Sequence, residues 1–274
     1  MTQIAFIGGG NMARSLIGGM LKTGVARSSI TVADPSATTR EALGRDFGVA
    51  AYADTAPAAM HAEVIVLAVK PQVVPMLGAG LHDVLQQQRP LLISIAAGVR
   101  LEQLERWFGS GLAIVRCMSN LPTLIGACAN GLCANLRVGA AQKAIAEHML
   151  GTVGVTCWVD DENLMDTDTA LSGSGPAYSF ALAEHVMAAA VAPGLPPHTA
   201  RTLTAQTCLG AGRMLGESGE DPVLLRARVT SPHGATQAAL DSFSSHDLRG
   251  IVASAIAAAT RRGAELSDAV DRSA

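Results

Sequence analysis

Short apolar runs alternate with amphipathic helical patterns from the amino terminus to Trp158. The runs that predict strands are Ile4–Ile7, Ser29–Ala33, Glu63–Ala68, Leu91–Ala96, Leu112–Arg116 and Thr152–Trp158. Helical periodicity lies between them, near Asn11–Lys22, Thr38–Phe47, Val73–Gln87, Leu101–Phe108 and Gly139–Leu150. Continuous apolar strands joined by helical crossovers predict a doubly wound, mainly parallel α/β sheet that helices cover on both faces.

The pattern changes after Asp160 and Asp161. From Glu162 onward the sequence predicts no strand, only Ala- and Leu-rich helical stretches interrupted by Gly and Pro. We therefore expect an α/β domain over residues 1–159 and an all-α domain over residues 160–274. Helical stretches such as Ala181–Ala192 are rich in small residues and poor in charge, which favours packing against a second subunit over an ordinary intrachain bundle.

Composition narrows the class of protein. The chain has 274 residues, of which 49% are hydrophobic, so it is large enough for a substantial core. A net charge of −3, with 16% charged residues and no recurring basic run, argues against a nucleic-acid partner. The most apolar segments, such as Ile251–Thr260, are far too short to cross a bilayer, so no membrane is expected.

Cysteine and histidine usage adds two expectations. Five cysteines without a CxxC pair indicate reduced thiols, and the first strand begins too close to residue 1 to leave room for a signal peptide. We therefore expect a cytoplasmic protein. The seven histidines are scattered without a metal-ligand spacing, so no metal site is expected.

A glycine-rich turn follows the first predicted strand and precedes a helical pattern. The spacing Gly8-x-Gly10-x-x-Ala13 fits the dinucleotide-binding fingerprint with alanine in the third place. Gly8 would make the tight turn, and Gly10 would let the backbone approach a pyrophosphate. In this context of strand, turn and helix, the motif predicts a Rossmann-type nucleotide site rather than a merely structural turn.

The residues after the second predicted strand leave the phosphate state of the cofactor open. Asp34 lies where the ribose-binding acid is expected, and its carboxylate would repel a 2′-phosphate. The polar side chains that follow could instead cradle such a phosphate: Ser36, Thr38, Thr39 and Arg40. NADP(H) and NAD(H) are both compatible with this segment.

Two other strand ends carry residues suited to a cofactor, because ligands of open α/β sheets bind beyond the carboxyl ends of the strands. Ala68-Val-Lys-Pro71 would place Lys70 near the ribose or the phosphates, although an ordinary solvated lysine is the alternative. Ile95-Ala-Ala-Gly98 offers little bulk where a nicotinamide ring must lie.

The segment Leu225–Leu240 carries a second candidate site. Ser231 followed by Pro232 predicts a helix with Ser231 as its N-cap and Pro232 at its first position. The free N–H groups of such a terminus would bind a small carboxylate, and the Thr236 hydroxyl would hydrogen-bond a substrate heteroatom beside it. On the pattern alone, an ordinary capped helix is the alternative.

These motifs, in this order, closely resemble those of the pyrroline-5-carboxylate reductases, which catalyse the last step of proline biosynthesis. The shared stretches run along nearly the whole chain: Gly8–Ala13, Ala68–Pro71, Ser172–Tyr178 and Val229–Thr236. The resemblance implies an enzyme that transfers hydride from NAD(P)H to the cyclic imine 1-pyrroline-5-carboxylate and forms L-proline. It also implies a Rossmann domain followed by an interlocked, all-α dimerisation domain, and a homodimer that can assemble into a higher homo-oligomer.

The resemblance further assigns roles to individual residues. By position, the cofactor would contact Gly8, Gly10, Asn11, Met12, Lys70 and Ala97. The substrate carboxylate and ring nitrogen would be bound by Ser231, Gly234, Ala235 and Thr236. Glu162 would lie near the substrate amine. Thr236 would orient the ring nitrogen and relay its proton, with Tyr178 as the second candidate donor.

Three positions depart from the usual pattern of this family. Ser119 replaces a common proline, His233 a common glycine, and Arg228 a position often held by asparagine. We expect the first two to be tolerated, because backbone N–H groups do the binding there. Arg228 would alter the cofactor contacts.

Three other functions would make different demands on the sequence. A β-hydroxyacid dehydrogenase would need a lysine in its helical half, and Lys22, Lys70 and Lys143 all precede that half. A reductase of a related cyclic imine stays open, because one methylene in a pocket discriminates only about 10–200-fold. A non-catalytic nicotinamide-nucleotide sensor on the same fold would have no need of the carboxylate site around Thr236.

Overall fold

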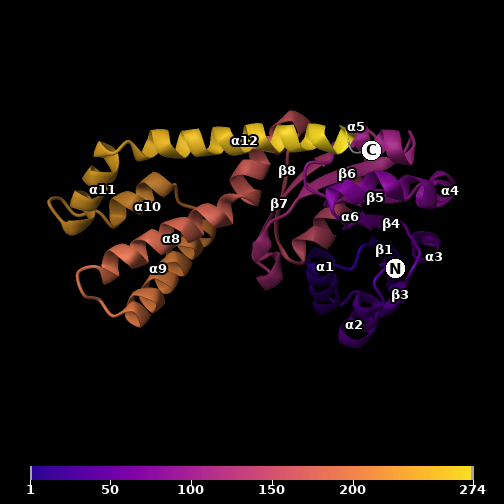
Figure 1. The fold of residues 1–274 in the computed structure, drawn as a ribbon, viewed down its shortest axis with the longest axis horizontal. Helices are drawn as coiled ribbons and strands as arrows, with labels where there is room; N and C mark the ends of the chain where they lie inside the picture. The colour runs from indigo at the N-terminus through magenta and orange to yellow at the C-terminus, as the bar shows by residue number, and fades with distance from the viewer. Residues whose placement is uncertain (1, 273–274) are drawn as a thin grey trace. The chain divides into compact units, whose positions relative to one another are not determined.

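The computed structural model describes residues 2–272, and its strands form one eight-stranded sheet in the order β3-β2-β1-β4-β5-β6-β7-β8 (Figure 1). The strands are β1 (Ile4–Ile7), β2 (Ile30–Ala33), β3 (Ala50–Tyr52), β4 (Val64–Leu67), β5 (Leu91–Ser94), β6 (Ala113–Met118), β7 (Cys128–Ala134) and β8 (Gly154–Trp158). Every neighbouring pair is parallel except β6 and β7, so β7 and β8 run against the other strands. The predicted mainly parallel α/β sheet is confirmed.

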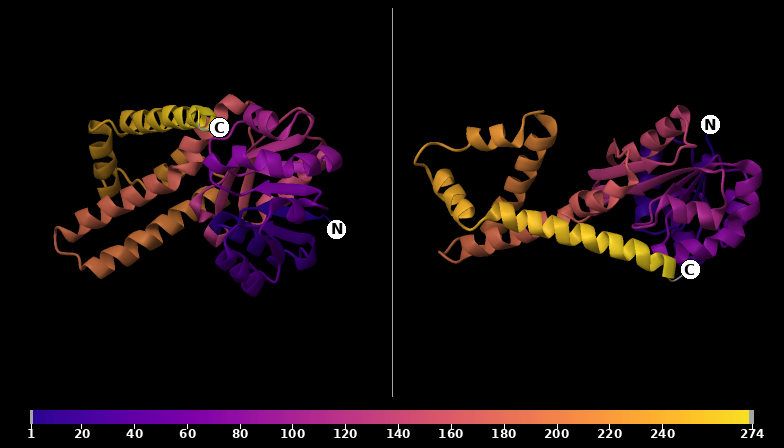
Figure 2. Two further views of the ribbon diagram at one scale, coloured as in Figure 1. Left: turned by 45° about the vertical axis from the view of Figure 1, so that its right-hand side comes forward. Right: turned by 90° about the horizontal axis from the view of Figure 1, so that it is seen from above.

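Helices alternate with the strands and lie on both sides of the sheet (Figure 2). They are α1 (Asn11–Lys22), α2 (Ala37–Phe47), α3 (Thr55–Ala59), α4 (Gly78–Gln88), α5 (Leu101–Phe108), α6 (Ala140–Gly151) and α7 (Met165–Asp168). Short 3-10 turns connect some of them, over Arg27–Ser29, Pro71–Leu77, Leu121–Ile125 and Glu162–Leu164. A π-helical turn, Thr169–Gly173, follows α7 directly.

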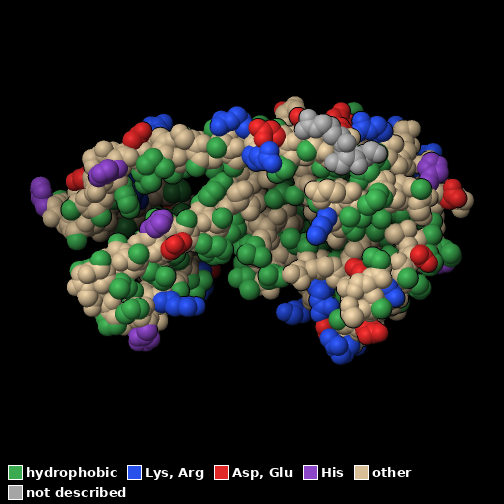
Figure 3. Space-filling model, viewed as in Figure 1, with side chains coloured by type: hydrophobic (Ala, Val, Ile, Leu, Met, Phe, Trp, Pro, Cys, Tyr) green, Lys and Arg blue, Asp and Glu red, His purple; other side chains and the backbone are tan. Residues whose placement is uncertain are grey.

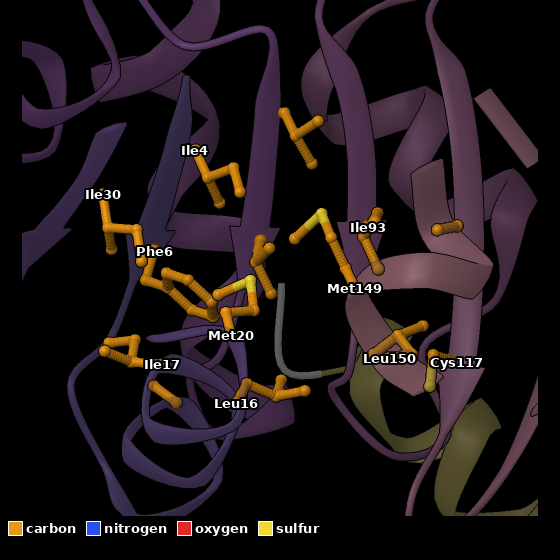
Figure 4. Packing of buried hydrophobic residues seen from close by; sticks show 14 of the residues in the cluster. Ile4, Phe6, Leu16, Ile17, Met20, Ile30, Ile93, Cys117, Met149 and Leu150 are labelled. Atoms are coloured by element: carbon orange, nitrogen blue, oxygen red, sulfur yellow. The ribbon is translucent and has the colours of Figure 1, made fainter. Parts of the chain in front are cut away.

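Successive side chains of β1 point to opposite faces of the sheet and contribute to two apolar layers, one on each face. Ile4 and Phe6 join the layer formed with α1 and α6, where Met20 and Met149 pack beside them (Figure 4). Ala5 and Ile7 join the opposite layer, formed with α3, α4 and α5. Because both faces are covered, β1 is buried at every position, and a continuous apolar run is the pattern typical of such a strand.

Two strands carry no predictive pattern in the sequence. β3 has three residues and no buried side chain, so it lacks an apolar signal. β7 contains Asn130 and Gly131, which are poor strand formers. Asn130 is nevertheless buried, and its Nδ2 donates to the carbonyl oxygens of Leu150 at 3.3 Å and Val155 at 3.1 Å. Tertiary hydrogen bonds therefore hold β7 in the sheet against its low propensity.

The chain divides into two compact units. Unit 1 comprises the residues up to Ser174 together with those from Ala257 onward, and unit 2 comprises Gly175–Ile256. The remaining helices are α8 (Gly175–Val191), α9 (Pro197–Glu217), α10 (Pro222–Arg228), α11 (Ala235–Ser245) and α12 (Leu248–Arg272), the last of which contributes to both units. The expected functional division at residues 159 and 160 stays a prediction.

Unit 2 contains few buried side chains. Within 175–256 the buried residues are Ala200, Thr204 and Leu225, and α8 has none. Hydrophobic side chains stand open along its helices (Figure 3), including Phe180, which is 61% exposed, and Leu209, which is 56% exposed. Helices with so little core of their own present the kind of surface that a second protein covers.

No helix within residues 2–272 is both long enough and apolar enough to span a membrane.

Candidate functional site

The glycine-rich turn after β1 has the geometry that a dinucleotide requires. Gly8 adopts a φ of +101°, and a Cβ there would lie 2.5 Å from the carbonyl oxygen of Ala68 at the end of β4. Only glycine fits both constraints. Gly10 is the N-cap of α1, and no described atom lies within 4 Å of the place its Cβ would take. The backbone is therefore open to a pyrophosphate where the free N–H groups of α1 begin.

Three of the predicted cofactor residues follow neighbouring parallel strands. Ile7 of β1 pairs with Leu67 of β4, which pairs with Ser94 of β5. Gly8, Lys70 and Ala97 come within three residues after these partners, so they meet at the carboxyl edge of the sheet. Lys70 and Ala97 are both exposed there.

Asp34, at the end of β2, contacts the glycine-rich turn. Its Oδ2 accepts a hydrogen bond from the N–H of Gly9 at 2.8 Å, and its Oδ1 accepts one from the N–H of Ser36 at 2.9 Å. Arg40 donates through Nη1 to the carbonyl oxygens of Asp34 and Pro35, at 2.8 Å each. Both carboxylate oxygens thus hold main-chain donors, although each retains a lone pair for a ribose hydroxyl.

The start of α11 differs from the sequence prediction. We expected Ser231 as the N-cap and Pro232 at the first helical position, and this prediction was wrong, because the helix begins at Ala235 with Gly234 as its N-cap. His233 adopts a φ of +60°, which no right-handed helix allows, and the N–H of Gly234 donates to the carbonyl oxygen of Ser231 at 3.0 Å.

Because α11 begins later than predicted, its N–H groups without an intrahelical partner lie further along the chain. They belong to the first turn of α11, at Ala235, Thr236 and Gln237, whereas the cap pattern places the first helical turn at residues 232–234. Ser231 and Thr236 are exposed, and Gly234 is half-buried. The predicted substrate residues between 231 and 236 therefore surround a helix terminus, but its donors begin three residues later than the cap pattern indicates.

Glu162 is half-buried and belongs to an ion-pair cluster around the buried Arg116. Its Oε1 accepts hydrogen bonds from the N–H of Leu101 at 2.8 Å and from Nη1 of Arg116 at 3.0 Å. Nη2 of Arg116 lies 3.5 Å from Oδ1 of Asp166. Arg116 is only 4% exposed, so its charge is balanced almost entirely by these acids. The Glu162 carboxylate is thereby fixed, while its role toward the substrate amine stays a prediction.

A second acid, Asp168, lies over β7 close to this cluster. Its Oδ1 accepts a hydrogen bond from the Ser172 hydroxyl at 2.8 Å, and burial raises the pKa of its carboxyl group above the usual value. Burial also raises the pKa of the Cys117 thiol to about 12, so this thiol stays protonated. Arg116 and Asp168 were both absent from the residues that the sequence singled out. An arginine inside an apolar strand, followed later by three closely spaced acids, is the signal that could have found them.

Comparison with known proteins bears on this site. A family model described as "Pyrroline-5-carboxylate reductase dimerisation" matches residues 162–266, and one described as "NADP oxidoreductase coenzyme F420-dependent" matches residues 3–98. A pyrroline-5-carboxylate reductase of Pseudomonas aeruginosa is 44% identical, and the alignment covers 97% of each chain. The chain belongs to the pyrroline-5-carboxylate reductase family. Members of this family reduce a cyclic imine with a reduced nicotinamide nucleotide and form L-proline.

Solved structures of reductases agree with the fold. The pyrroline-5-carboxylate reductase of Coxiella burnetii superposes with a TM-score of 0.94 at 41% identity, covering 97% of this chain and 98% of that one. The Plasmodium falciparum pyrroline carboxylate reductase, solved with NADP bound, gives a TM-score of 0.82 at 28% identity, with 97% and 98% covered. These matches favour the reductase over the dehydrogenase and sensor alternatives, and the dimerisation match agrees with the open helices of unit 2.

Proposed function

We propose that the carboxyl edge of the sheet binds the reduced nicotinamide nucleotide through Gly8, Gly10, Asn11, Met12 and Lys70, with Ala97 beside the nicotinamide. The open backbone at Gly10 and the positive φ of Gly8 support this assignment. When bound, the nucleotide supplies the hydride. The protein's task is to hold the imine carbon against the nicotinamide within about 3–3.5 Å.

The substrate carboxylate binds the first turn of α11. The N–H groups of Ala235 and Thr236 point along the helix axis, where the partial positive charge of the helix favours an anion. Ser231 and Gly234 complete the cradle around this terminus. Glu162 acts near the substrate amine, and the Thr236 hydroxyl orients the ring nitrogen and relays its proton.

Replacement of Thr236 by alanine tests this assignment. Positioning supplies most of the rate and the hydroxyl contributes the proton relay, so Thr236→Ala should lower kcat by about 10²-fold without abolishing turnover. The measurement is oxidation of the reduced nucleotide with pyrroline-5-carboxylate as substrate. Thr202→Ala is the matched control, because the Thr202 hydroxyl donates to the carbonyl oxygen of His198 in α9. Equal rates for the two variants would remove Thr236 from the mechanism.

NADPH is the preferred coenzyme in this proposal. Asp34 turns both oxygens toward main-chain N–H groups, which weakens the repulsion of a 2′-phosphate. Beyond it, the Ser36 and Thr38 hydroxyls lie 2.9 Å apart at the first turn of α2, where a phosphate is favoured. Arg40 adds a positive charge to the same turn.

Comparison of NADPH with NADH tests the coenzyme proposal. The ratio of kcat/KM for NADPH to that for NADH should exceed one, and Arg40→Ala should lower it by about tenfold, because a charge-assisted bond to phosphate is lost. Arg45→Ala, on the same helix but exposed and paired with Asp46, should leave the ratio unchanged. A ratio below one in the unmodified enzyme would show that Asp34 selects the unphosphorylated ribose.

The proposal also covers the domains, the oligomeric state and the cellular location of the enzyme. Residues 1–159 serve as the dinucleotide-binding domain and residues 160–274 as the substrate-binding and dimerisation domain. Homodimers assemble further into a higher homo-oligomer. The enzyme works in the cytoplasm, which the five free cysteines support, since reducing conditions keep thiols unpaired.

A further inference from the structure

The Asp168 carboxyl group takes a place in the sheet that a side chain of β7 would otherwise occupy. A Cβ built on Gly131 would overlap both the carboxyl carbon and Oδ2 of Asp168. The acid therefore packs directly on the backbone of β7, and only glycine at position 131 makes room for it. This close packing against the β7 backbone restricts movement of the carboxyl group.

One oxygen of this carboxyl group is bonded and the other is not. Oδ1 accepts from the Ser172 hydroxyl at 2.8 Å. Oδ2 is buried, and among residues 2–272 no hydrogen-bond partner reaches it. A buried oxygen without a partner costs far less free energy on a neutral carboxylic acid than on a carboxylate. The surroundings thus favour the protonated form.

The charged and titratable groups nearby do not reverse this preference. They are Arg116 and Cys117 on β6, Cys128 and Cys133 on β7, Asp166 on α7 itself and Glu162 on the preceding turn. Arg116 is the one cation of this group, and its guanidinium already pairs with Glu162 and Asp166. Burial is the leading influence on the pKa of Asp168 and raises it, while Ser172 and Arg116 act in the opposite direction.

Asp168 lies at the junction of α7 and the π-helical turn Thr169–Gly173, which touches the end of β6. Nδ2 of Asn120, just beyond β6, donates to the carbonyl oxygen of Ser172 at 3.0 Å. A Cβ built on Gly173 would overlap the methyl group of Met118, the last residue of β6. The turn therefore rests on the carboxyl edge of the sheet, the edge at which dinucleotides bind.

We propose that Asp168 is a positioning residue that works as a neutral carboxylic acid, fastening the turn Thr169–Gly173 to β6 and β7 and releasing it on loss of its proton. The effect on catalysis rests on the proposed site, because the turn acts on the cofactor edge through Asn120 and Met118. The effect on the turn itself does not depend on that site.

The direction of the pH effect follows from linkage. The folded protein binds the Asp168 proton more tightly than the unfolded chain does, because its pKa is raised on folding. The stabilisation is therefore complete below the unfolded pKa, about 3.9, and is lost as the pH rises through the folded value. Raising the pH through the folded pKa of Asp168 loosens the turn, and acidic conditions secure it.

Two variants separate the neutral acid from its charge. Asp168→Asn keeps the shape and the hydrogen-bond acceptor for Ser172 but cannot ionise, whereas Asp168→Ala removes both. At acidic pH the unmodified enzyme and Asp168→Asn should have kcat/KM values for NADPH within about twofold, and at alkaline pH the unmodified enzyme should fall about tenfold below Asp168→Asn. Asp168→Ala should be low throughout. Titration of the substrate imine affects all three enzymes equally, so it cancels in these ratios.

Hydrogen exchange of residues 165–174 provides a readout that does not depend on activity. After correction for the intrinsic pH dependence of exchange, protection should fall with rising pH in the unmodified protein and stay constant in Asp168→Asn. A third variant tests the packing: Gly131→Ala should lower the urea midpoint in the unmodified background and have little effect in the Asp168→Ala background.

These readouts distinguish the possible failures. Unchanged ratios of kcat/KM, together with pH-independent exchange in the unmodified protein, would overturn the proposal. Pronounced pH dependence of exchange without any change in the kcat/KM ratios would support the release of the turn and refute its effect at the cofactor edge.

Discussion

Arg116 is a buried charge that depends on acids from outside the sheet. It belongs to β6, yet its partners Glu162 and Asp166 lie in the segment after β8. Taking an arginine out of water costs several kcal/mol, which is recovered only when both the Coulombic attraction and the hydrogen bonds are in place. Loss of the arginine would leave the carboxylates of Glu162 and Asp166 without their counter-charge.

Substitution of Arg116 should therefore be costly. We expect Arg116→Met to lower the free energy of unfolding by about 3 kcal/mol, because it leaves the acids without their counter-charge. Arg213→Met is the matched control: Arg213 pairs with Glu217 on the surface of α9, and such exposed pairs contribute little to stability. Urea denaturation measures both, and equal losses would contradict the burial argument.

At the scale of residues, the sequence predicted the glycines well and the buried acids poorly. The spacing of Gly8 and Gly10 reflects a local requirement of the backbone, which the pattern states directly. The clustering of Arg116 with Glu162, and the place of Asp168 over Gly131, arise because segments far apart in the sequence meet in the fold. The local spacing of residues along the sequence carries no information about such long-range contacts.

At the scale of elements, six of the eight strands were predictable from apolar runs, and β3 and β7 were not. β1 and β4 are buried throughout and appear as plain apolar runs. β7 carries Asn130 and Gly131, which serve a hydrogen-bond network and make room for Asp168 respectively. Its sequence meets those needs at the expense of strand propensity, so the usual pattern is missing.

The start of α11 was misplaced for a related reason. Ser231-Pro232 is a good helix opening, but the positive φ of His233 interrupts the helix before it begins. Positive φ is a property of the turn as a whole, and its one sign in the sequence is that His233 stands where the family commonly has glycine. The terminus that we propose to bind the substrate thus follows a strained residue.

Relief of this strain should stabilise the protein. His233→Gly should raise the free energy of unfolding by about 1 kcal/mol, because glycine adopts a left-handed conformation without the steric penalty. His185→Gly, within the regular helix α8, should have the opposite effect and lower it by about 1 kcal/mol. Thermal denaturation measures the stability of both variants. A loss of stability on His233→Gly would show that the histidine side chain makes contacts that outweigh the strain.

At the scale of the whole molecule, unit 2 is a set of helices with few buried side chains. Its apolar side chains stay exposed in the isolated chain, and the family match assigns residues 162–266 to dimerisation. The composition of this region, rich in small and apolar residues, was enough to predict a partner subunit. The sequence did not reveal which faces the partner covers, because all sides of α8 are similarly apolar.

Disruption of this surface should dissociate the assembly. We expect Phe180→Asp to convert the protein to monomers at micromolar concentration, because a charge would be buried without a partner in the interface. Met76→Asp is the control: Met76 is 71% exposed in unit 1, and the assembled mass should not change. Analytical ultracentrifugation gives the mass of each variant, and an intact dimer of Phe180→Asp would exclude α8 from the interface.

The last described turns of α12 contact α5 in unit 1, although more than half of the sequence separates these two helices. Nε2 of Gln103 donates to the carbonyl oxygen of Ser267 at 3.0 Å, and Arg100 pairs with Asp268 at 2.8 Å, so α5 is completed by the last turns of α12. A ribosome delivers the sheet and α5 well before these turns of α12. The nascent sheet must therefore wait, with α5 partly uncovered, until α12 has been synthesised.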